Sequence, residues 1–327
     1  MLQTSSAPLL QVEDLQTYFF TRRGVVKAVD GVSFSVAPGE TLGIVGESGS
    51  GKTMTSLSLL RLVPQPGGKI VGGKVLFEGV DLLKLSEADM RDYRGAKISM
   101  ILQDPMASLN PVYTVGEQVA EPLRQHQKLR GQALWSKVID ALRLLRIPAP
   151  QARLRNYPHQ MSGGMRQRVV GGIAISCRPQ LIIADEPTTA LDATIQAQYL
   201  ALLKDVQRQT NVGMIFVSHD LSVIGRMCDR VAVMYAGKIV ETAGVRELFN
   251  HPKHPYTAAL LASVPRLDQK VERLASIEGQ PPALIDLPPG CRFAPRCTLA
   301  DERCTREDPP RVQVGEKHFA SCWRASE

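Results

Sequence analysis

The segment Gly46–Thr53, with the sequence G-E-S-G-S-G-K-T, constrains the fold of this chain more than any other feature. It fits the pattern G-x-x-x-x-G-K-[ST], in which glycines let the backbone curl until its N–H groups point inward and form a cradle for anions. The apolar run Thr41–Val45 before it indicates a short buried strand, and Met54–Val63 after it indicates an apolar helix. The sequence therefore predicts a phosphate-binding loop between a strand and a helix, with the positive end of the helix dipole facing the anion.

Each part of this loop has its own expected role in binding ATP and Mg²⁺. Lys52 is expected to reach the β- and γ-phosphates, and the Thr53 hydroxyl is expected to ligate Mg²⁺. The other loop residues are expected to line the cradle, namely Gly46, Glu47, Ser48, Gly49, Ser50 and Gly51.

The overall composition is typical of one or two globular domains rather than of a membrane-spanning or secreted chain. The chain has 327 residues, of which 44% are apolar, enough for a sizeable core. It has no run of 18 apolar residues, and Met1–Leu10 lacks the pattern of a secretory signal, so we expect it in the cytoplasm. The net charge of +7 is spread out, which favours a solvated basic surface over a patch that binds nucleic acid.

The apolar patterning predicts an α/β fold. Short alternating runs predict an antiparallel β layer beside the loop, at residues 10–15, 32–36 and 75–77. Helical spacing then predicts a mostly helical insertion over about residues 104–178. The runs Leu181–Ala184 and Gly213–Val217 indicate buried parallel strands, with a helix over Ala197–Gln207 between them.

Two acidic residues, Asp185 and Glu186, follow the first of these parallel strands directly. Asp185 is expected to hold the Mg²⁺ shell, as a Walker-B aspartate does. Glu186 is expected to polarise the attacking water as general base. An Asp-Glu pair after a strand is common by itself, but behind a phosphate-binding loop it indicates a P-loop ATPase.

The segment Ser162-Gly163-Gly164 stands before a predicted helix, Met165–Ser176, and offers a second backbone site for an anion. With this segment the chain closely resembles the ATPase subunits of ABC transporters, whose Leu-Ser-Gly-Gly-Gln signature completes the ATP site of a partner subunit. Met161 and Met165 replace the first and last residues of that signature, while its Ser-Gly-Gly core is intact. The resemblance covers about residues 9–260 and implies an ABC ATPase domain that includes the helical insertion as a subdomain.

The same resemblance implies roles for further residues around the nucleotide. Gln103 matches the Q-loop glutamine, which senses Mg²⁺ and water, and Asp192 matches the D-loop, which crosses the interface between two subunits. His219 matches the switch histidine and is expected to contact the γ-phosphate. Phe19, with Tyr18 as the alternative, is expected to stack on adenine. ATP would then lie between the phosphate-binding loop of one subunit and the Ser-Gly-Gly segment of another.

Peripheral motifs resemble the dipeptide/oligopeptide branch of importers, namely residues 103–111, 185–198 and 254–257 together with the cysteine-bearing tail. Within that branch the chain is most similar to the D-type ATPases. The resemblance implies an ATP-hydrolysing subunit that powers peptide import at the cytoplasmic face of the inner membrane. It also implies a second related ATPase as heterodimer partner, two transmembrane permeases and an extracytoplasmic peptide-binding protein. Relatives in this branch serve nickel or glutathione, so these cargoes stay open.

Two other classes of function fit the sequence less well. A soluble ABC ATPase acting on DNA or ribosomes usually carries a coiled-coil insertion or two cassettes, and this chain has one cassette and no heptad tract. A regulatory subunit with a dead site is disfavoured by the intact residues Lys52, Thr53, Asp185, Glu186 and His219.

The cysteines divide into two kinds. Cys177 and Cys228 lie singly in apolar stretches and are expected to be buried small hydrophobes. The other four follow the spacing C-x₅-C-x₆-C-x₁₇-C in a proline-rich tail: Cys291, Cys297, Cys304 and Cys322. Four such thiolates can hold a [4Fe–4S] cluster or Zn²⁺. The wide spacing, the prolines and the family resemblance favour the cluster, with Zn²⁺ and metal-free thiols as alternatives. We expect residues 261–327 to form a loop-rich extension held by something other than a core of its own.

Overall fold

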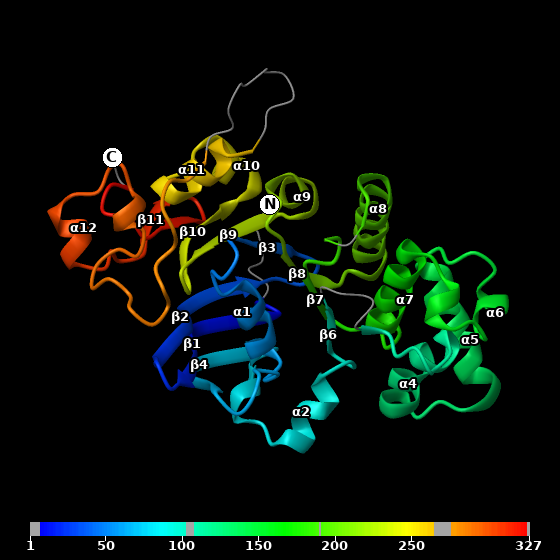
Figure 1. Cartoon of the computed structure of the whole chain (residues 1–327). Helices are drawn as coiled ribbons and strands as arrows, with labels where there is room; N and C mark the ends of the chain where they lie inside the picture. The colour runs from blue at the N-terminus through cyan, green and yellow to red at the C-terminus, as the bar shows by residue number, and fades with distance from the viewer. Residues whose placement is uncertain (1–6, 103–107, 190, 265–275, 326–327) are drawn as a thin grey trace. The chain divides into compact units, whose positions relative to one another are not determined.

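The computed structural model describes residues 7–102, 108–189, 191–264 and 276–325 (Figure 1). The chain forms two compact units. The helical unit comprises Met1–Leu9, Val36–Glu40 and Lys84–Val217. The P-loop unit comprises Leu10–Ser35, Thr41–Leu83 and Ser218–Glu327, so the cysteine-bearing tail and the phosphate-binding loop belong to the same unit.

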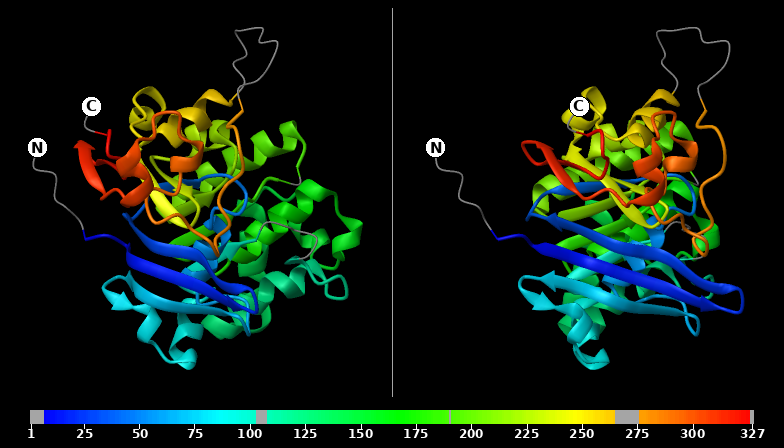
Figure 2. Two further views of the ribbon diagram at one scale, coloured as in Figure 1. Left: turned by 60° about the vertical axis from the view of Figure 1, so that its left-hand side comes forward. Right: turned by 90° about the vertical axis from the view of Figure 1, so that its left-hand side faces the viewer.

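The P-loop unit contains a four-stranded sheet in the order β2-β1-β4-β5. Its strands are β1 (Leu10–Thr21), β2 (Gly24–Val36), β4 (Gly68–Phe77) and β5 (Val80–Asp81). The long strands β1 and β2 run side by side in both views of Figure 2. Alternate residues of β1 are buried in two pairs, Leu10 with Val12 and Leu15 with Thr17, and the register shifts between the pairs. The predicted antiparallel β layer is confirmed.

A second group of paired strands in the P-loop unit follows the order β11-β12-β10-β9-β3. These are β3 (Thr41–Val45), β9 (Arg230–Tyr235), β10 (Lys238–Gly244), β11 (Val312–Gly315) and β12 (His318–Ala320). Strands β3 and β9 are parallel, and the pairs from β9 to β11 are antiparallel. The helices of this unit are α1 (Lys52–Leu59), α9 (Leu221–Met227), α10 (Val245–Asn250), α11 (Pro255–Ala262) and α12 (Glu302–Arg306). Two short 3₁₀ turns, η1 (Leu82–Lys84) and η3 (Ala294–Arg296), complete the order of elements.

Within the P-loop unit, the described part of the tail packs against β9, β10 and α11 rather than around a core of its own. Phe293 is 3% exposed, and its ring centroid lies 5.3 Å from that of Tyr235 and 5.4 Å from that of Tyr256. The tail hairpin β11–β12 pairs with β10, and His318 Nε2 lies 2.7 Å from the buried carboxylate of Glu241. These partners are far away in sequence, which is why local patterning did not reveal them.

The helical unit is built on three buried parallel strands in the order β6-β7-β8, which are β6 (Ile98–Ile101), β7 (Leu181–Asp185) and β8 (Gly213–Val217). Its helices are α2 (Glu87–Tyr93), α4 (Val115–Gln127), α5 (Gly131–Leu144), α6 (Pro150–Arg153), α7 (Gly163–Ile175) and α8 (Ala193–Thr210), with a 3₁₀ turn η2 (Pro158–Gln160). Helices α4, α5 and α7 pack together, as the green region of Figure 1 shows, through a core that includes Val119, Leu142 and Val169. Helices α4 to α7 fill most of the stretch predicted to be helical, and the two predicted parallel strands are confirmed.

Helix α8 is the longest helix in the described part of the chain, at 18 residues. Neither it nor any other described helix combines the length and the apolar character needed to cross a bilayer.

Candidate functional site

The phosphate-binding loop joins β3 to α1, with Gly51 as the N-cap of the helix. Two of its glycines are required by the surrounding backbone. Gly46 has φ +156°, and a Cβ there would lie 2.0 Å from the carbonyl oxygen of Met234. Gly51 has φ +107°, and a Cβ there would lie 2.2 Å from the carbonyl oxygen of Ala28. The loop therefore has a fixed curl that other residue types would break.

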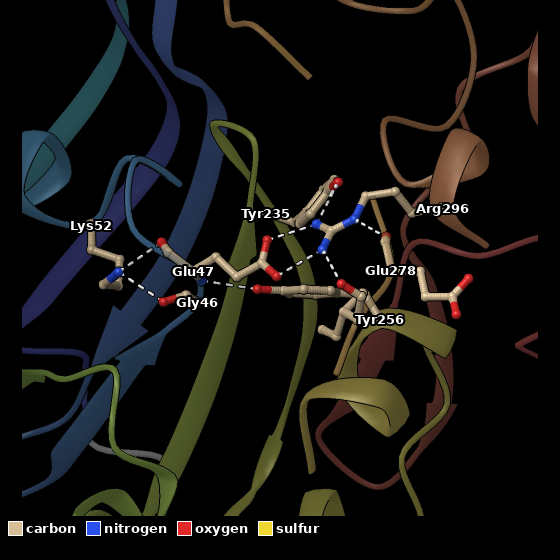
Figure 3. Close-up of polar contacts among 8 residues, drawn as sticks. Gly46, Glu47, Lys52, Tyr235, Tyr256, Glu278 and Arg296 are labelled. Atoms are coloured by element: carbon tan, nitrogen blue, oxygen red, sulfur yellow. Dashed lines mark hydrogen bonds and ion pairs between the residues drawn. The ribbon is translucent and has the colours of Figure 1, made fainter. Parts of the chain in front are cut away.

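Lys52 lies at the inner side of this curl, where it is 6% exposed. Its Nζ donates hydrogen bonds to the carbonyl oxygens of Gly46 at 2.8 Å and Glu47 at 2.9 Å, as Figure 3 shows. The ammonium group is thereby held against the loop backbone, next to the N-terminus of α1. This is the arrangement of positive charge and helix dipole that binds phosphate.

Two residues from distant parts of the chain support the loop, and sequence reasoning did not find either. The Glu47 N–H donates to the hydroxyl of Tyr256, on α11, at 2.9 Å. The guanidinium of Arg296, in η3, binds both carboxylate oxygens of Glu47, at 2.7 and 3.0 Å. This carboxylate raises the pKa of Arg296 above its ordinary value, while burial raises the pKa of Tyr256. No local sequence signal marks these contacts, because they span 209 and 249 residues.

His219 also belongs to the P-loop unit and is exposed. The preceding residue, Ser218, donates its N–H to the carbonyl oxygen of Ile44 in β3 at 3.2 Å, so the chain reaches His219 beside the strand that leads into the loop. Asp220 then caps α9 by accepting hydrogen bonds from the Ser222 and Val223 N–H groups.

The aromatic residues at the end of β1 differ in their surroundings. The Tyr18 hydroxyl donates to Asp30 at 2.5 Å, and burial together with this carboxylate raises the pKa of Tyr18 to about 12. Phe19 is half-buried, close to Gly68. Phe20, which the sequence did not single out, is 49% exposed with the Lys69 ammonium over its ring. Stacking of Phe19 on adenine stays a prediction.

In the helical unit, the two acidic residues lie at the carboxyl end of β7. Asp185 is 2% exposed and pairs in register with Val217 of β8. Glu186 has φ +46° and donates its N–H to the Val217 carbonyl at 3.0 Å. Its carboxylate accepts a hydrogen bond from the Thr189 hydroxyl at 3.0 Å. The local fold thus buries the Asp185 carboxylate and leaves the Glu186 side chain partly accessible.

The Ser162-Gly163-Gly164 segment forms the start of α7. The helix begins at Gly163 rather than at the predicted Met165, so both glycines lie in its first turn, where N–H groups lack helical partners. Ser162 caps the helix by accepting from the Met165 N–H at 3.4 Å. Ser162 and Gly163 are exposed, and a Cβ built on Gly163 would meet no described atom within 4 Å. At Gly164 a Cβ would lie 2.7 Å from an Ile195 methyl group.

Asp192 is the exposed N-cap of α8, and its Oδ1 accepts from the Thr194 and Ile195 N–H groups at 3.1 and 3.0 Å. Gln103 lies outside the described residues. The structure therefore gathers the phosphate-binding loop, Phe19 and His219 in the P-loop unit, and the acidic pair, the Ser-Gly-Gly segment and Asp192 in the helical unit.

The tail cysteines line one small cavity of about 20 Å³ in the P-loop unit, together with His254 and Phe293. Such a volume holds roughly one water molecule. Burial, aided by the neighbouring thiols, raises the pKa of Cys291 to about 11. Within the described ranges, no group of three or more His, Cys, Asp or Glu side chains is placed to hold a metal ion. The [4Fe–4S] cluster, or Zn²⁺, expected at these cysteines stays a prediction. Cys177 and Cys228 are buried, as predicted.

Comparison with known families gives two matches along the chain. Residues 29–189 match the ABC transporter family, and residues 240–304 match the oligopeptide/dipeptide transporter C-terminal region. Two solved structures of the ATP-binding cassette MJ0796 share the fold. Both are dimeric structures; the one bound to ADP and Pi has a TM-score of 0.64 at 24% identity, and the other has a TM-score of 0.63 at 25% identity. Each alignment covers 72% of this chain and 99% of the solved chain. Fold and loop together define an ATPase of the ABC class.

Full-length relatives narrow the class further. A probable peptide ABC transporter ATP-binding protein, y4tR, of Sinorhizobium fredii is 50% identical over 98% of this chain and 96% of its own length. The dipeptide transport ATP-binding protein DppD of Bacillus subtilis is 50% identical over 96% of this chain and 94% of its own length. The oligopeptide transport ATP-binding protein OppD of the same organism is 49% identical over 96% of this chain and 88% of its own length. The chain belongs to the ATP-binding subunits of the oligopeptide/dipeptide ABC transporters.

Proposed function

We propose that this chain binds MgATP at Gly46–Thr53 and that its hydrolysis drives the import of di- or oligopeptides. The observation that carries the proposal is the preformed loop, in which Gly46 and Gly51 fix the curl and Lys52 is held inside it. Phosphate oxygens of ATP would replace the two loop carbonyls as partners of the Lys52 ammonium. Thr53 and Asp185 would hold Mg²⁺, the latter through its water shell.

Hydrolysis in this proposal depends on residues at the ends of buried strands. Glu186 would orient the attacking water and accept its proton, which the partly accessible carboxylate supports. His219 would contact the γ-phosphate, and Gln103 would sense Mg²⁺ and the water. Since the proposal involves no covalent intermediate with the protein, positioning and charge stabilisation would supply most of the rate enhancement.

The Ser162-Gly163-Gly164 segment is proposed to act on the nucleotide of a partner subunit. Its support is the exposed start of α7, where a Cβ on Gly163 would meet no described atom. The helix N–H groups there can bind the γ-phosphate of an ATP that another loop presents. Asp192 would lie at the same interface. By analogy with the transporter relatives, we propose a related second ATPase as the partner.

The assembly is proposed to include two transmembrane permeases and an extracytoplasmic peptide-binding protein, with this chain peripheral at the cytoplasmic face of the membrane. Residues 9–260 would form the ATPase domain, including the helical subdomain at about 104–178, and residues 261–327 would form its extension. The names of the relatives support peptides as cargo. Nickel and glutathione are the alternatives to be tested.

The deciding experiment is reconstitution of the co-purified complex in vesicles, with uptake measured for labelled peptides, Ni²⁺ and glutathione. We expect ATP-dependent uptake of peptides. The Glu186→Gln complex should bind ATP but lose most turnover and uptake. Hydrolysis at the normal rate by this variant would refute the general-base role. Uptake of Ni²⁺ or glutathione in place of peptide would refute the cargo.

We also propose that the tail thiols take up a metal group, with [4Fe–4S] favoured over Zn²⁺. The support is the donor set, since four thiols line one cavity. Anaerobically prepared protein should be brown, with absorbance near 400 nm, and should contain iron. Elemental analysis that finds neither iron nor zinc would rule out a metal group.

A further inference from the structure

The phosphate-binding loop is supported by a short stretch of the tail, the segment Cys291–Cys297, which has the sequence C-R-F-A-P-R-C. We call it the two-arginine segment. Its arginines, Arg292 and Arg296, both reach toward the surroundings of the loop, and Phe293 between them is buried. Its end residues are two of the four cysteines that line the small cavity.

Arg296 makes a complete set of hydrogen bonds with its side chain 4% exposed. Each of the five guanidinium N–H groups has an acceptor, namely the two carboxylate oxygens of Glu47, the hydroxyl of Tyr235 and the carbonyl oxygens of Ile277 and Glu278. Figure 3 shows the fork of Arg296 directed at the Glu47 carboxylate. Because all of its N–H groups are hydrogen-bonded, the guanidinium has a fixed position, and it fixes the position of the carboxylate that it binds.

Arg292 fixes the loop's surroundings at a second place. Its side chain is 8% exposed, forms an ion pair with Asp30 and donates to the carbonyl oxygen of Ala236. The next residue, Gly237, donates its N–H to the carbonyl oxygen of Ser50 in the loop at 2.8 Å. The two-arginine segment therefore contacts the loop directly at Glu47 and through one intervening turn at Ser50.

We propose that Arg296 is a positioning residue of the phosphate-binding loop and that the two-arginine segment thereby sets the affinity for ATP. Glu47 is the second residue of the loop, and its carbonyl oxygen holds the Lys52 ammonium at 2.9 Å. A shift of Glu47 thus displaces the lysine that phosphate must meet. The proposal rests on the proposed function of Gly46–Thr53 as the ATP site.

The test is titration of the full-length chain with the fluorescent probe MANT-ATP in the presence of Mg²⁺. Arg296→Met should weaken binding about tenfold, because the loop then samples conformations with misdirected N–H groups. Arg296→Lys should weaken binding less, since a lysine keeps the charge but cannot bind both oxygens at once. The matched control is Arg306→Met, which removes an exposed arginine of α12 paired with Glu302 and should leave affinity unchanged.

A double-mutant cycle separates positioning from a general structural role. If Arg296 acts through Glu47, the two losses of affinity should not add. The Glu47→Gln/Arg296→Met double variant should then bind MANT-ATP no more weakly than whichever single variant has the lower affinity. Additive losses, or wild-type affinity of Arg296→Met, would overturn the proposal. Thermal unfolding checks each variant, and if Arg296→Met does not fold, the cycle is run with Arg296→Lys.

The variant Lys52→Ala distinguishes a failure of the proposed ATP site from a failure of the positioning role of Arg296. If Lys52→Ala keeps wild-type affinity for MANT-ATP, the proposed ATP site itself is wrong. If Lys52→Ala loses binding while Arg296→Met and Arg296→Lys do not, the ATP site stands and only the positioning role is refuted.

Discussion

The two stretches proposed to bind phosphate, Gly46–Thr53 and Ser162–Gly164, are held very differently within their own units. The first is fixed by close backbone contacts at Gly46 and Gly51 and by side chains from α11 and η3. The second has one long cap hydrogen bond at 3.4 Å, and its Gly163 faces open space among the described residues.

This difference indicates two kinds of binding surface. A loop that is already curled and carries a buried lysine can bind phosphate with little ordering on binding, and so with higher affinity. An exposed helix start with open space at its glycine can approach a ligand that another molecule presents. We therefore expect the first stretch to bind nucleotide in the isolated chain and the second to contribute only in the assembled pair.

The largest expected effect is the loss of nucleotide binding in Lys52→Ala. Removing the buried ammonium should weaken MANT-ATP binding by the isolated chain about 1000-fold, since a buried charge contact to phosphate is lost. Gly163→Ala in the same titration should change affinity by less than about twofold. A comparable loss in both variants would break the contrast between the two stretches.

The second effect concerns stability at the loop glycines. Gly46→Ala should lower the free energy of unfolding by about 3 kcal/mol, because the new Cβ would collide with the Met234 carbonyl. The control is Gly49→Ala, where φ is +76° but a Cβ meets no described atom within 4 Å. That change should cost only the left-handed penalty of about 1 kcal/mol. Equal losses in urea unfolding would show that the tight backbone contact does not hold the loop.

The third effect appears only in the assembled transporter. Gly163→Ala should lower ATP hydrolysis about 100-fold, because its methyl group keeps the partner's phosphate from the helix N–H groups. The unfolding free energy of the chain should change by less than about 0.5 kcal/mol. Gly164→Ala should instead destabilise the chain, since its Cβ would lie 2.7 Å from an Ile195 methyl group. Normal hydrolysis by assembled Gly163→Ala would contradict the role of this segment.

The same contrast explains which parts of the structure could be predicted from the sequence alone. The phosphate-binding loop and the Asp185-Glu186 pair were predictable, because their residues are contiguous and their flanking strands carry a strong apolar pattern. The start of α7 was misplaced by two residues, since two glycines with low helix propensity looked like a loop rather than a capped first turn. Helix α8 is likewise longer than predicted, because its N-cap Asp192 lies well before the apolar run.

The supports of the loop could not be predicted. Arg296 meets Glu47 across 249 residues, and nothing in the two local sequences marks them as partners. The buried position of Phe293 among aromatic rings has the same cause, because its neighbours Tyr235 and Tyr256 come from other elements. Composition could suggest a tail without a core of its own, but it could not show the elements outside the tail, among them α11 and β10, that it packs against.

The smallest expected effect tests whether local caps alone hold the exposed parts of the helical unit. Asp192→Ala removes the acceptor of two N–H groups at the start of α8 and should lower the unfolding free energy by about 1 kcal/mol. Asp192→Asn keeps an equally good cap and should leave the unfolding free energy unchanged. Any loss of ATP hydrolysis by this variant in the assembled pair would therefore come from the interface rather than from folding. Neither variant should alter MANT-ATP binding by the isolated chain. A clear loss of that binding in Asp192→Asn would mean that Asp192 acts on the nucleotide of its own subunit, and the division of labour between the two stretches would be wrong.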